Sequence, residues 1–356
     1  MMSHNLREDE YFGTGLLVLR LASPLLFLLV FLGLAAAQTT DFKGETVTIQ
    51  IGYGPGGGYD TYGRALARHY GRFIPGNPAV VAKNMPGAGS LRVANHIYNL
   101  TARDGVEIGL IAASTALEAL MGNDQAKFDV TRFGWIGSMN QDVSFCGLWQ
   151  GPGVAASFPD MLKRESKELI FGSAGPAAIS HQHPLILRNV FKANIRVIAG
   201  YEGQRGVNLA MQRGEVNGAC ALFVSSINAQ WWPHVQSGQL RLFLQMGPKT
   251  TNQFGQVPDV FDFVTTGEDK KVLELHFKQT ILGRPFMTSP NLPKERLAVL
   301  RKAFLDTMKD REFLADAQKM NLDIDIATAE EVEQLLKEFV GYPKNVIEKA
   351  RAAIGR

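Results

Sequence analysis

The sequence has few cysteines, no excess of charge of one sign and, after its first forty residues, no long apolar run. Its 356 residues include 2 cysteines, Cys146 and Cys220, which are too few for a cysteine-based zinc site or a disulfide framework. Lys and Arg total 37 against 34 Asp and Glu, a formal net charge of +3, and no basic run is present, which argues against a nucleic-acid binder. A hydrophobic fraction of 46% excludes wholesale disorder, and the length suggests two domains.

The first forty residues are typical of a secretory signal. Arg20 precedes the uncharged apolar stretch Leu21–Leu34, and three alanines at 35–37 follow it. This is the order of a positive residue, a hydrophobic region and a small-residue cleavage site. A membrane anchor is the alternative, because the uncharged stretch reaches the lower limit for spanning a bilayer. We expect residues 1–37 to be a signal peptide and the mature chain to be exported.

Strands and helices are expected to alternate along the mature chain in two arrays, with helices at its end. The expected strands are 46–51, 79–83 and 107–112 in the first array, and 168–172, 195–199, 216–222 and 239–245 in the second. An extended segment, 137–153, separates the arrays. This alternation predicts an α/β fold with two doubly wound parallel sheets. Such sheets bind ligands beyond the carboxyl ends of their strands, so we expect a ligand cleft between two domains.

A glycine-rich loop, Gly54–Asp60, lies between the first strand and the first helix. Its backbone N–H groups and the unpaired donors of the helix N-terminus could bind a carboxylate or a phosphate. The glycines could instead serve only to make a sharp turn. Asp60 could cap the helix or face the cleft.

Nucleotide cofactors are not expected at this loop. Gly52–Gly57 matches the G-x-G-x-x-G pattern, but a dinucleotide fold also needs an acidic residue after its second strand. Asn84 follows that strand here. No Lys-Ser or Lys-Thr follows the glycines, so the pattern of a phosphate-binding nucleotidase loop is also absent.

A second strand-to-helix turn, Phe171–His181, carries small residues and hydroxyls. Ser173 and Ser180 could donate hydrogen bonds to an anion, or one of them could act with His181 as an exported serine hydrolase. The spacing of a nucleophile elbow is absent. His181 and His183 do not by themselves complete a metal site. We therefore expect no catalytic residue and no metal.

Four segments in order resemble the extracytoplasmic solute receptors of tripartite tricarboxylate transporters, the Bug-type receptors. They are the glycine loop and first helix at 51–64, an Asn before Pro-Gly-Ala-Gly at 84–89, the Ser-x-Gly turn ending in His at 171–181, and the Tyr-x-Gly helix start at 201–203 with Gly214–Val216. The resemblance covers about residues 45–245 and is looser in the terminal helices.

The resemblance implies a type II, Venus-flytrap periplasmic binding protein that captures a small organic acid and does not catalyse. Di- and tricarboxylates, acidic amino acids and aromatic acids are the ligands it implies, and the membrane subunits of a tripartite importer are the partners. A ligand-presenting subunit for a membrane sensor kinase is the alternative. The expected division is a signal peptide at 1–37, domain 1 at 41–143 and 246–356, and domain 2 at 144–245.

The resemblance also implies the residues that hold the ligand. They are Tyr53, Gly57, Asp60, Ser114, Thr115, Ser173, Gly175, His181, Tyr201 and Gly203. The chain departs from the family's pattern at Ala178, Gly200 and Glu202, and in the strand around 217–221, where its residues are small or neutral. We expect the far half of the pocket to be roomier and less polar than is usual.

Overall fold

The computed structural model describes residues 40–151 and 157–356. The signal peptide expected at 1–37 therefore lies outside the described residues. No described helix is long and apolar enough to cross a membrane.

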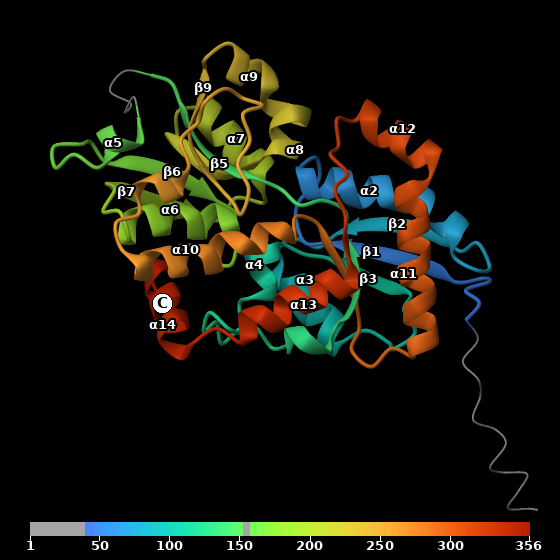
Figure 1. Cartoon of the computed structure of the whole chain (residues 1–356). Coiled ribbons are helices and arrows are strands. Elements are labelled where there is room, and N and C mark those ends of the chain that lie inside the picture. The colour runs from blue at the N-terminus through green and yellow to red at the C-terminus, as the bar shows by residue number, and fades with distance from the viewer. Residues whose placement is uncertain (1–39, 152–156) are drawn as a thin grey trace, which may run out of the picture. The chain divides into compact units, whose positions relative to one another are not determined.

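The described chain is built on two sheets that lie side by side, with helices packed around them (Figure 1). We call the region around the six-stranded sheet the first lobe and the region around the five-stranded sheet the second lobe. The first sheet has the order β11-β4-β10-β3-β1-β2, and its strands are β1 Thr46–Ile51, β2 Ala79–Asn84, β3 Glu107–Leu110, β4 Gly134–Ser138, β10 Pro285–Thr288 and β11 Ala327–Thr328. The second has the order β7-β6-β8-β5-β9, and its strands are β5 Ser144–Trp149, β6 Leu169–Ser173, β7 Ile195–Ala199, β8 Gly218–Phe223 and β9 Leu240–Met246.

Both sheets are mixed: they contain the parallel pairs that the alternation predicts, together with antiparallel strands that it does not predict. The predicted strands β1, β2 and β3 do pair in parallel, as do β6, β7 and β8. However, β10 runs antiparallel to β3 and β4, and β5 runs antiparallel to β8 and β9. The segment 137–153, expected as an extended connection, thus contributes a strand that lies inside the second sheet.

Helices follow most of the strands. They are α2 Gly58–Tyr70, α3 Leu91–Asn99, α4 Ala113–Ala116, α5 Phe158–Met161, α6 Ile179–Asn189, α7 Gln204–Gln212, α8 Val224–Ser226, α9 Trp232–Gln236, α10 Gly267–Lys278, α11 Lys294–Lys309, α12 Arg311–Lys319, α13 Ala329–Val340 and α14 Lys344–Ala353. A capping box formed by Thr328 and Glu331 begins α13.

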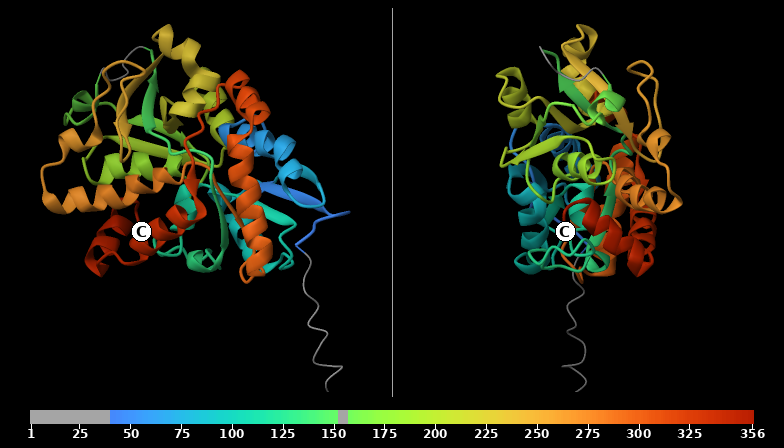
Figure 2. Two further views of the ribbon diagram at one scale, coloured as in Figure 1. Left: turned by 45° about the vertical axis from the view of Figure 1, so that its right-hand side comes forward. Right: turned by 90° about the vertical axis from the view of Figure 1, so that its left-hand side faces the viewer.

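The chain crosses between the lobes through two segments that run side by side. The Asp142 amide donates to the Thr280 carbonyl at 3.1 Å, and the Gly283 amide donates to the Asn140 carbonyl at 3.0 Å. The expected division ended domain 2 at residue 245, which would place the second crossing directly after β9. Instead, residues that follow β9 stay against the second lobe, where the Phe277 ring lies 5.0 Å from that of His183. Figure 2 shows α10 in the second lobe from two further directions.

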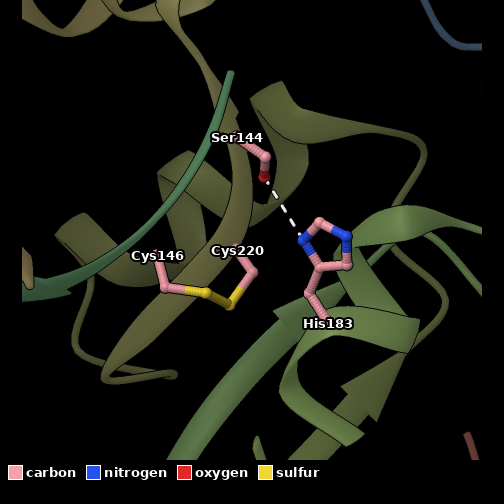
Figure 3. Close-up of a disulfide and its surroundings, with 4 residues drawn as sticks. All are labelled: Ser144, Cys146, His183 and Cys220. Atoms are coloured by element: carbon pink, nitrogen blue, oxygen red, sulfur yellow. Dashed lines mark hydrogen bonds between the residues drawn. A yellow bond between two sulfur atoms is a disulfide. The ribbon is translucent and has the colours of Figure 1, made fainter. Parts of the chain in front are cut away.

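A disulfide joins Cys146 of β5 to Cys220 of β8, a pairing that the sequence left open. The two strands are antiparallel neighbours, and their register shifts between Phe145 and Gly147. Figure 3 shows the bridge beside His183, whose Nδ1 lies 3.3 Å from the Ser144 hydroxyl. The bond therefore ties together two strands of the second sheet within its buried core.

Candidate functional site

A cavity of about 360 Å³ is lined by residues of both lobes. The first lobe contributes the loop between β1 and α2, together with Arg284. The second lobe contributes the start of α6, the start of α7 and the end of β8. The cavity thus lies where the carboxyl ends of parallel strands meet, as sheets of this kind predict.

The first helix of the site, α2, begins at the cavity without a side-chain cap. Its N-cap is Gly57, with φ −91° and ψ 173°, and no side chain in the described chain caps it. The first-turn N–H groups of a helix have no intrahelical partner and carry partial positive charge. Gly57, Gly58 and Tyr59 line the cavity, so the donors of this turn are available to a bound anion.

Asp60 organises this loop and does not line the cavity. Its carboxylate accepts hydrogen bonds from the Gly56 amide at 2.9 Å, from Asn84 at 2.8 Å and from Arg64 at 2.9 Å. Burial would raise the pKa of Asp60, but the hydrogen bonds from Arg64, Gly56 and Asn84 outweigh it and lower the pKa. Asn84 also donates to the Tyr53 carbonyl at 2.9 Å. This bond connects the glycine loop of segment 51–64 to segment 84–89.

Two helices of the second lobe begin at the same cavity, again without side-chain caps among the described residues. The N-cap of α6 is Ala178, and that of α7 is Gly203. Gly203 has φ +136°, a conformation that L side chains rarely adopt. Ile179 and Ser180 of α6 and the first residues of α7 line the cavity.

The two lobes contact each other around the cavity. The Gly54 amide of the first lobe donates to the Glu202 carbonyl of the second at 3.0 Å. The Ser114 hydroxyl donates to the Ala177 carbonyl at 2.7 Å. Gly89 comes so close that a Cβ there would lie 2.6 Å from the Ala178 nitrogen.

Ser114 lies in this contact between the lobes, Thr115 bonds within the first lobe, and neither lines the cavity. Both are fully buried. Thr115 donates to the Gly89 carbonyl at 2.7 Å and lies 2.8 Å from the Ser90 hydroxyl. Gly175, with φ +145°, also packs against Gly89.

Ser173 and His181 form a pair behind the cavity wall. The Ser173 Oγ lies 2.9 Å from His181 Nδ1, and Ser173 is fully buried. Burial, assisted by the charges of Arg356 and Arg188, lowers the pKa of His181 to about 4. Tyr201 lines a smaller adjoining pocket of about 280 Å³, which it shares with Tyr53.

Three of the ten expected site residues, Tyr53, Gly57 and Gly203, line the main cavity. The other seven lie in the surrounding shell. Sequence reasoning missed Arg284, Tyr59, Phe223 and Ser226, all of which line the cavity. The signal for Arg284 was its position as the lone charge in the apolar run 281–288.

One cluster of described side chains could in principle hold a metal ion. His69, Asp310 and Glu312 place ligand atoms within 4.8 Å of one another. However, Arg72 forms ion pairs with both carboxylates, so a cation already occupies the position that a metal would take. None of these residues lines the cavity.

The comparisons with known proteins agree with this geometry at the level of the fold. No protein-family model matches the chain, and no curated protein matches it. Among solved structures, the periplasmic binding protein BugD superposes with a TM-score of 0.66 at 18% identity, covering 86% of this chain and 97% of its own. MatC from Rhodopseudomonas palustris with bound malate has a TM-score of 0.66 at 14% identity, covering 87% and 98%.

A further R. palustris protein, Rpa4515 with adipate, has a TM-score of 0.67 at 13% identity and covers 88% of this chain and 99% of its own. These identities establish the architecture. The chain therefore has the two-domain fold of the periplasmic binding protein BugD, which MatC and Rpa4515 also match, and this is the fold that the sequence resemblance implies.

Proposed function

We propose that the protein is an exported solute receptor that captures a small carboxylate in the cavity and closes its two lobes on it. The observation that carries this proposal is the convergence of three uncapped helix starts, those of α2, α6 and α7, on one cavity that also holds Arg284. Helix N-termini and a guanidinium both stabilise an anion. Gly57, Gly203 and Tyr53 would contact the ligand, and Asp60 would hold the loop in place.

Closure would form the contacts between the lobes that the structure contains. The amide of Gly54 and the hydroxyl of Ser114 would reach the second lobe only after the ligand has been enclosed. Exclusion of water strengthens the hydrogen bonds to the carboxylate. The side-by-side crossing segments, 139–143 and 280–284, are the proposed hinge.

Binding is tested on the mature chain, residues 38–356, after unfolding and refolding to remove co-purified ligand. A thermal-shift screen covers monocarboxylates, di- and tricarboxylates, acidic amino acids and aromatic acids, with matched amides as controls. We expect at least one acid to raise the melting temperature with a dependence on concentration, and its amide to have no effect. No response to any acid would refute the proposal.

A serine hydrolase is the second candidate, because the Ser173 hydroxyl lies within hydrogen-bond distance of His181. Two observations weigh against it. Ser173 is fully buried and outside the cavity lining, and no carboxylate is hydrogen-bonded to His181 among the described residues. A hydrolase requires a third group that orients the base. Ester turnover that disappears in Ser173→Ala would favour this candidate.

We further propose that the closed receptor delivers its ligand to the membrane subunits of a tripartite importer in the periplasm. The sequence resemblance and the shared fold support this proposal. Presentation to a membrane sensor kinase is the alternative. Uptake of the radiolabelled acid by cells that contain or lack the receptor separates the two, because a sensor subunit would change gene expression without changing uptake.

A further inference from the structure

Arg284 is a buried cation at the wall of the cavity. Its side chain is 1% exposed, and it stands directly before β10, in the second crossing segment. The guanidinium carbon lies 4.5 Å from the ring centre of Tyr59 and 5.0 Å from those of Tyr62 and Phe223. Aromatic faces attract a cation, but they do not replace the hydrogen bonds that a guanidinium has in water.

The hydrogen bonding of Arg284 is incomplete. Nη1 donates to the Gly283 carbonyl at 2.7 Å, and Nη2 donates to the Ser225 hydroxyl at 3.1 Å. Nε has no partner within the described residues. The nearest carboxylate oxygen, on Asp142, is 3.8 Å from Nη2, beyond hydrogen-bond distance. That oxygen already accepts from Ser225 at 2.6 Å and from Asn140 at 2.9 Å.

Arg284 lies at one end of the cavity, beside the start of α2. A Cβ on Gly58 would lie 3.2 Å from Arg284 Nη2 and 2.8 Å from the Ser226 hydroxyl. The first turn of α2, the guanidinium and a hydroxyl therefore meet at this end. Only glycine at position 58 leaves room between them.

The uncapped starts of α6 and α7 form a second polar end of the cavity. Gly203 faces Tyr53, because a Cβ there would lie 3.6 Å from the Tyr53 ring. Tyr53 stacks on Tyr59 with ring centres 4.6 Å apart, and Tyr59 in turn lies against Arg284. Both tyrosines line the cavity. The two stacked rings therefore form an aromatic part of the cavity wall between Gly203 and Arg284.

We propose that Arg284 binds a second anionic group of the ligand and thereby selects a dicarboxylate with an apolar spacer over a monocarboxylate. This inference rests on the proposed function. One carboxylate is bound by the helix starts of the second lobe, the spacer lies along Tyr53 and Tyr59, and the other carboxylate meets Arg284 and the first turn of α2. Arg284 thus determines specificity through direct contact with the ligand.

The experiment compares acids of equal chain length, succinate with butanoate and adipate with hexanoate, by isothermal titration calorimetry. We expect the wild-type chain to bind at least one diacid about 30-fold more tightly than its monoacid, the size of a charge-assisted hydrogen bond. Arg284→Met should reduce this ratio to about threefold or less, and Arg284→Lys should retain part of it.

Arg296→Met is the matched control. Arg296 is also a buried arginine over an aromatic ring, that of Phe42 at 3.8 Å, and its Nη2 pairs with Glu45 at 2.8 Å. It does not line the cavity. We expect this variant to lower stability and to leave the diacid-to-monoacid ratio unchanged.

Asp142→Asn tests the same role without removing Arg284, in case Arg284→Met does not fold. Loss of the nearby carboxylate should leave the guanidinium more available and raise the affinity for the diacid severalfold. Equal losses for diacid and monoacid in Arg284→Met, no diacid preference in the wild type, or no gain in Asp142→Asn would overturn the inference and leave carboxylate binding intact. If no acid binds to the wild type, the proposed function fails as well.

Discussion

The three helices that begin at the cavity differ from α10, α12 and α13, which begin elsewhere, in how their first turn is satisfied. α2, α6 and α7 begin after Gly57, Ala178 and Gly203, none of which caps the helix with a side chain. In α10, α12 and α13, the side chains of Thr266, Asp310 and Thr328 accept a first-turn N–H. A side-chain cap stabilises a helix by about 1 kcal/mol, so the chain forgoes this stabilisation where the ends of three helices meet.

In the proposed function, the ligand supplies the cap that α2, α6 and α7 lack. At the starts of α10, α12 and α13, a hydroxyl or carboxylate accepts a first-turn N–H, whereas α11 and α14 begin after Pro293 and Pro343 without a side-chain cap. At the cavity these donors are left open, and Arg284 is added to them. The following predictions separate the affinity for a carboxylate from the stability of the fold.

Removal of the disulfide should have the largest effect, and on stability alone. Cys146 and Cys220 are 74 residues apart in sequence, and closing a loop of that length stabilises a protein by about 4 kcal/mol in the chain-entropy model. The double variant Cys146→Ala/Cys220→Ala should lose about that much unfolding free energy in urea, whereas its carboxylate affinity should be unchanged. An equal loss of affinity would mean that the rigidity of the second lobe, and not its helix ends, determines binding.

A side-chain cap introduced at the cavity should lower the affinity for the carboxylate and leave the stability of the fold unchanged. Gly57 has extended backbone geometry, and a Cβ there meets nothing within 4 Å, so Gly57→Asp is sterically allowed. Its carboxylate should accept the N–H groups of α2, repel the ligand and lower affinity by about 10- to 100-fold. Stability should be unchanged or slightly higher.

Gly57→Ala is the control for that variant, because it adds a Cβ without an anion. Its affinity should stay within about threefold of the wild type, since it leaves the helix donors open. If Gly57→Ala and Gly57→Asp weaken binding equally, the helix end does not contact the ligand.

A decrease in pH should weaken the second lobe through the buried His183. Burial, with the nearby charge of His276, lowers the pKa of His183 from 6.5 to about 3. The unfolded chain therefore takes up a proton below about pH 6.5 that the folded chain does not, so stability falls as the pH falls. Between pH 7 and 5 this loss should be about 2 kcal/mol for one such histidine.

His183→Gln should remove that part of the pH dependence. Urea titrations at pH 7, 6 and 5 would show a slope shallower by about 2 kcal/mol over this range, whatever the variant's stability at pH 7. Burial raises the pKa of Asp142 and Glu118. These two carboxyls therefore increase stability as the pH falls, opposite to the effect of His183. Both carboxyls are present in the wild type and in His183→Gln, so their contribution cancels when the pH dependence of the variant is subtracted from that of the wild type.

Loss of a cap far from the cavity should have the smallest effect. Thr328→Ala removes the hydroxyl that accepts the Glu331 N–H at the start of α13. We expect a loss of about 1 kcal/mol in unfolding free energy and no change in affinity. Thr328→Ser should restore most of the stability. A change in affinity would contradict the separation between the two kinds of helix start.

The sequence predicted the site best where its residues lie close together along the chain. A strand, a glycine loop and a helix follow one another within 46–70, so their order predicts where Gly57 lies. The same is true of Gly203, because the parallel strands β6, β7 and β8 bring their carboxyl ends to one edge. Ser114 and Thr115 were placed at the correct strand end, but the Ser114 hydroxyl bonds across to the second lobe and the Thr115 hydroxyl bonds to Gly89 of its own lobe.

Arg284 could not be placed from the sequence. It reaches the cavity because the chain returns to the first sheet through β10, a strand of 4 residues that pairs with β3 and β4. These partners lie well over a hundred residues earlier in the chain. The sequence around Arg284 has no periodicity that predicts pairing with β3 and β4. A strand of only 4 residues is too short to show an alternating pattern.

The position of Trp231 has a consequence for how binding can be observed. It is fully buried at the end of the helical run that begins with α8 at Val224 and includes Ser226, and its ring lies 6.4 Å from that of Trp149 and 5.8 Å from that of His234. The emission of an indole depends on neighbouring rings and polar groups. A shift of this run as Ser226 meets the ligand should therefore change the intrinsic fluorescence, so that occupancy could be followed in stopped flow without an attached dye.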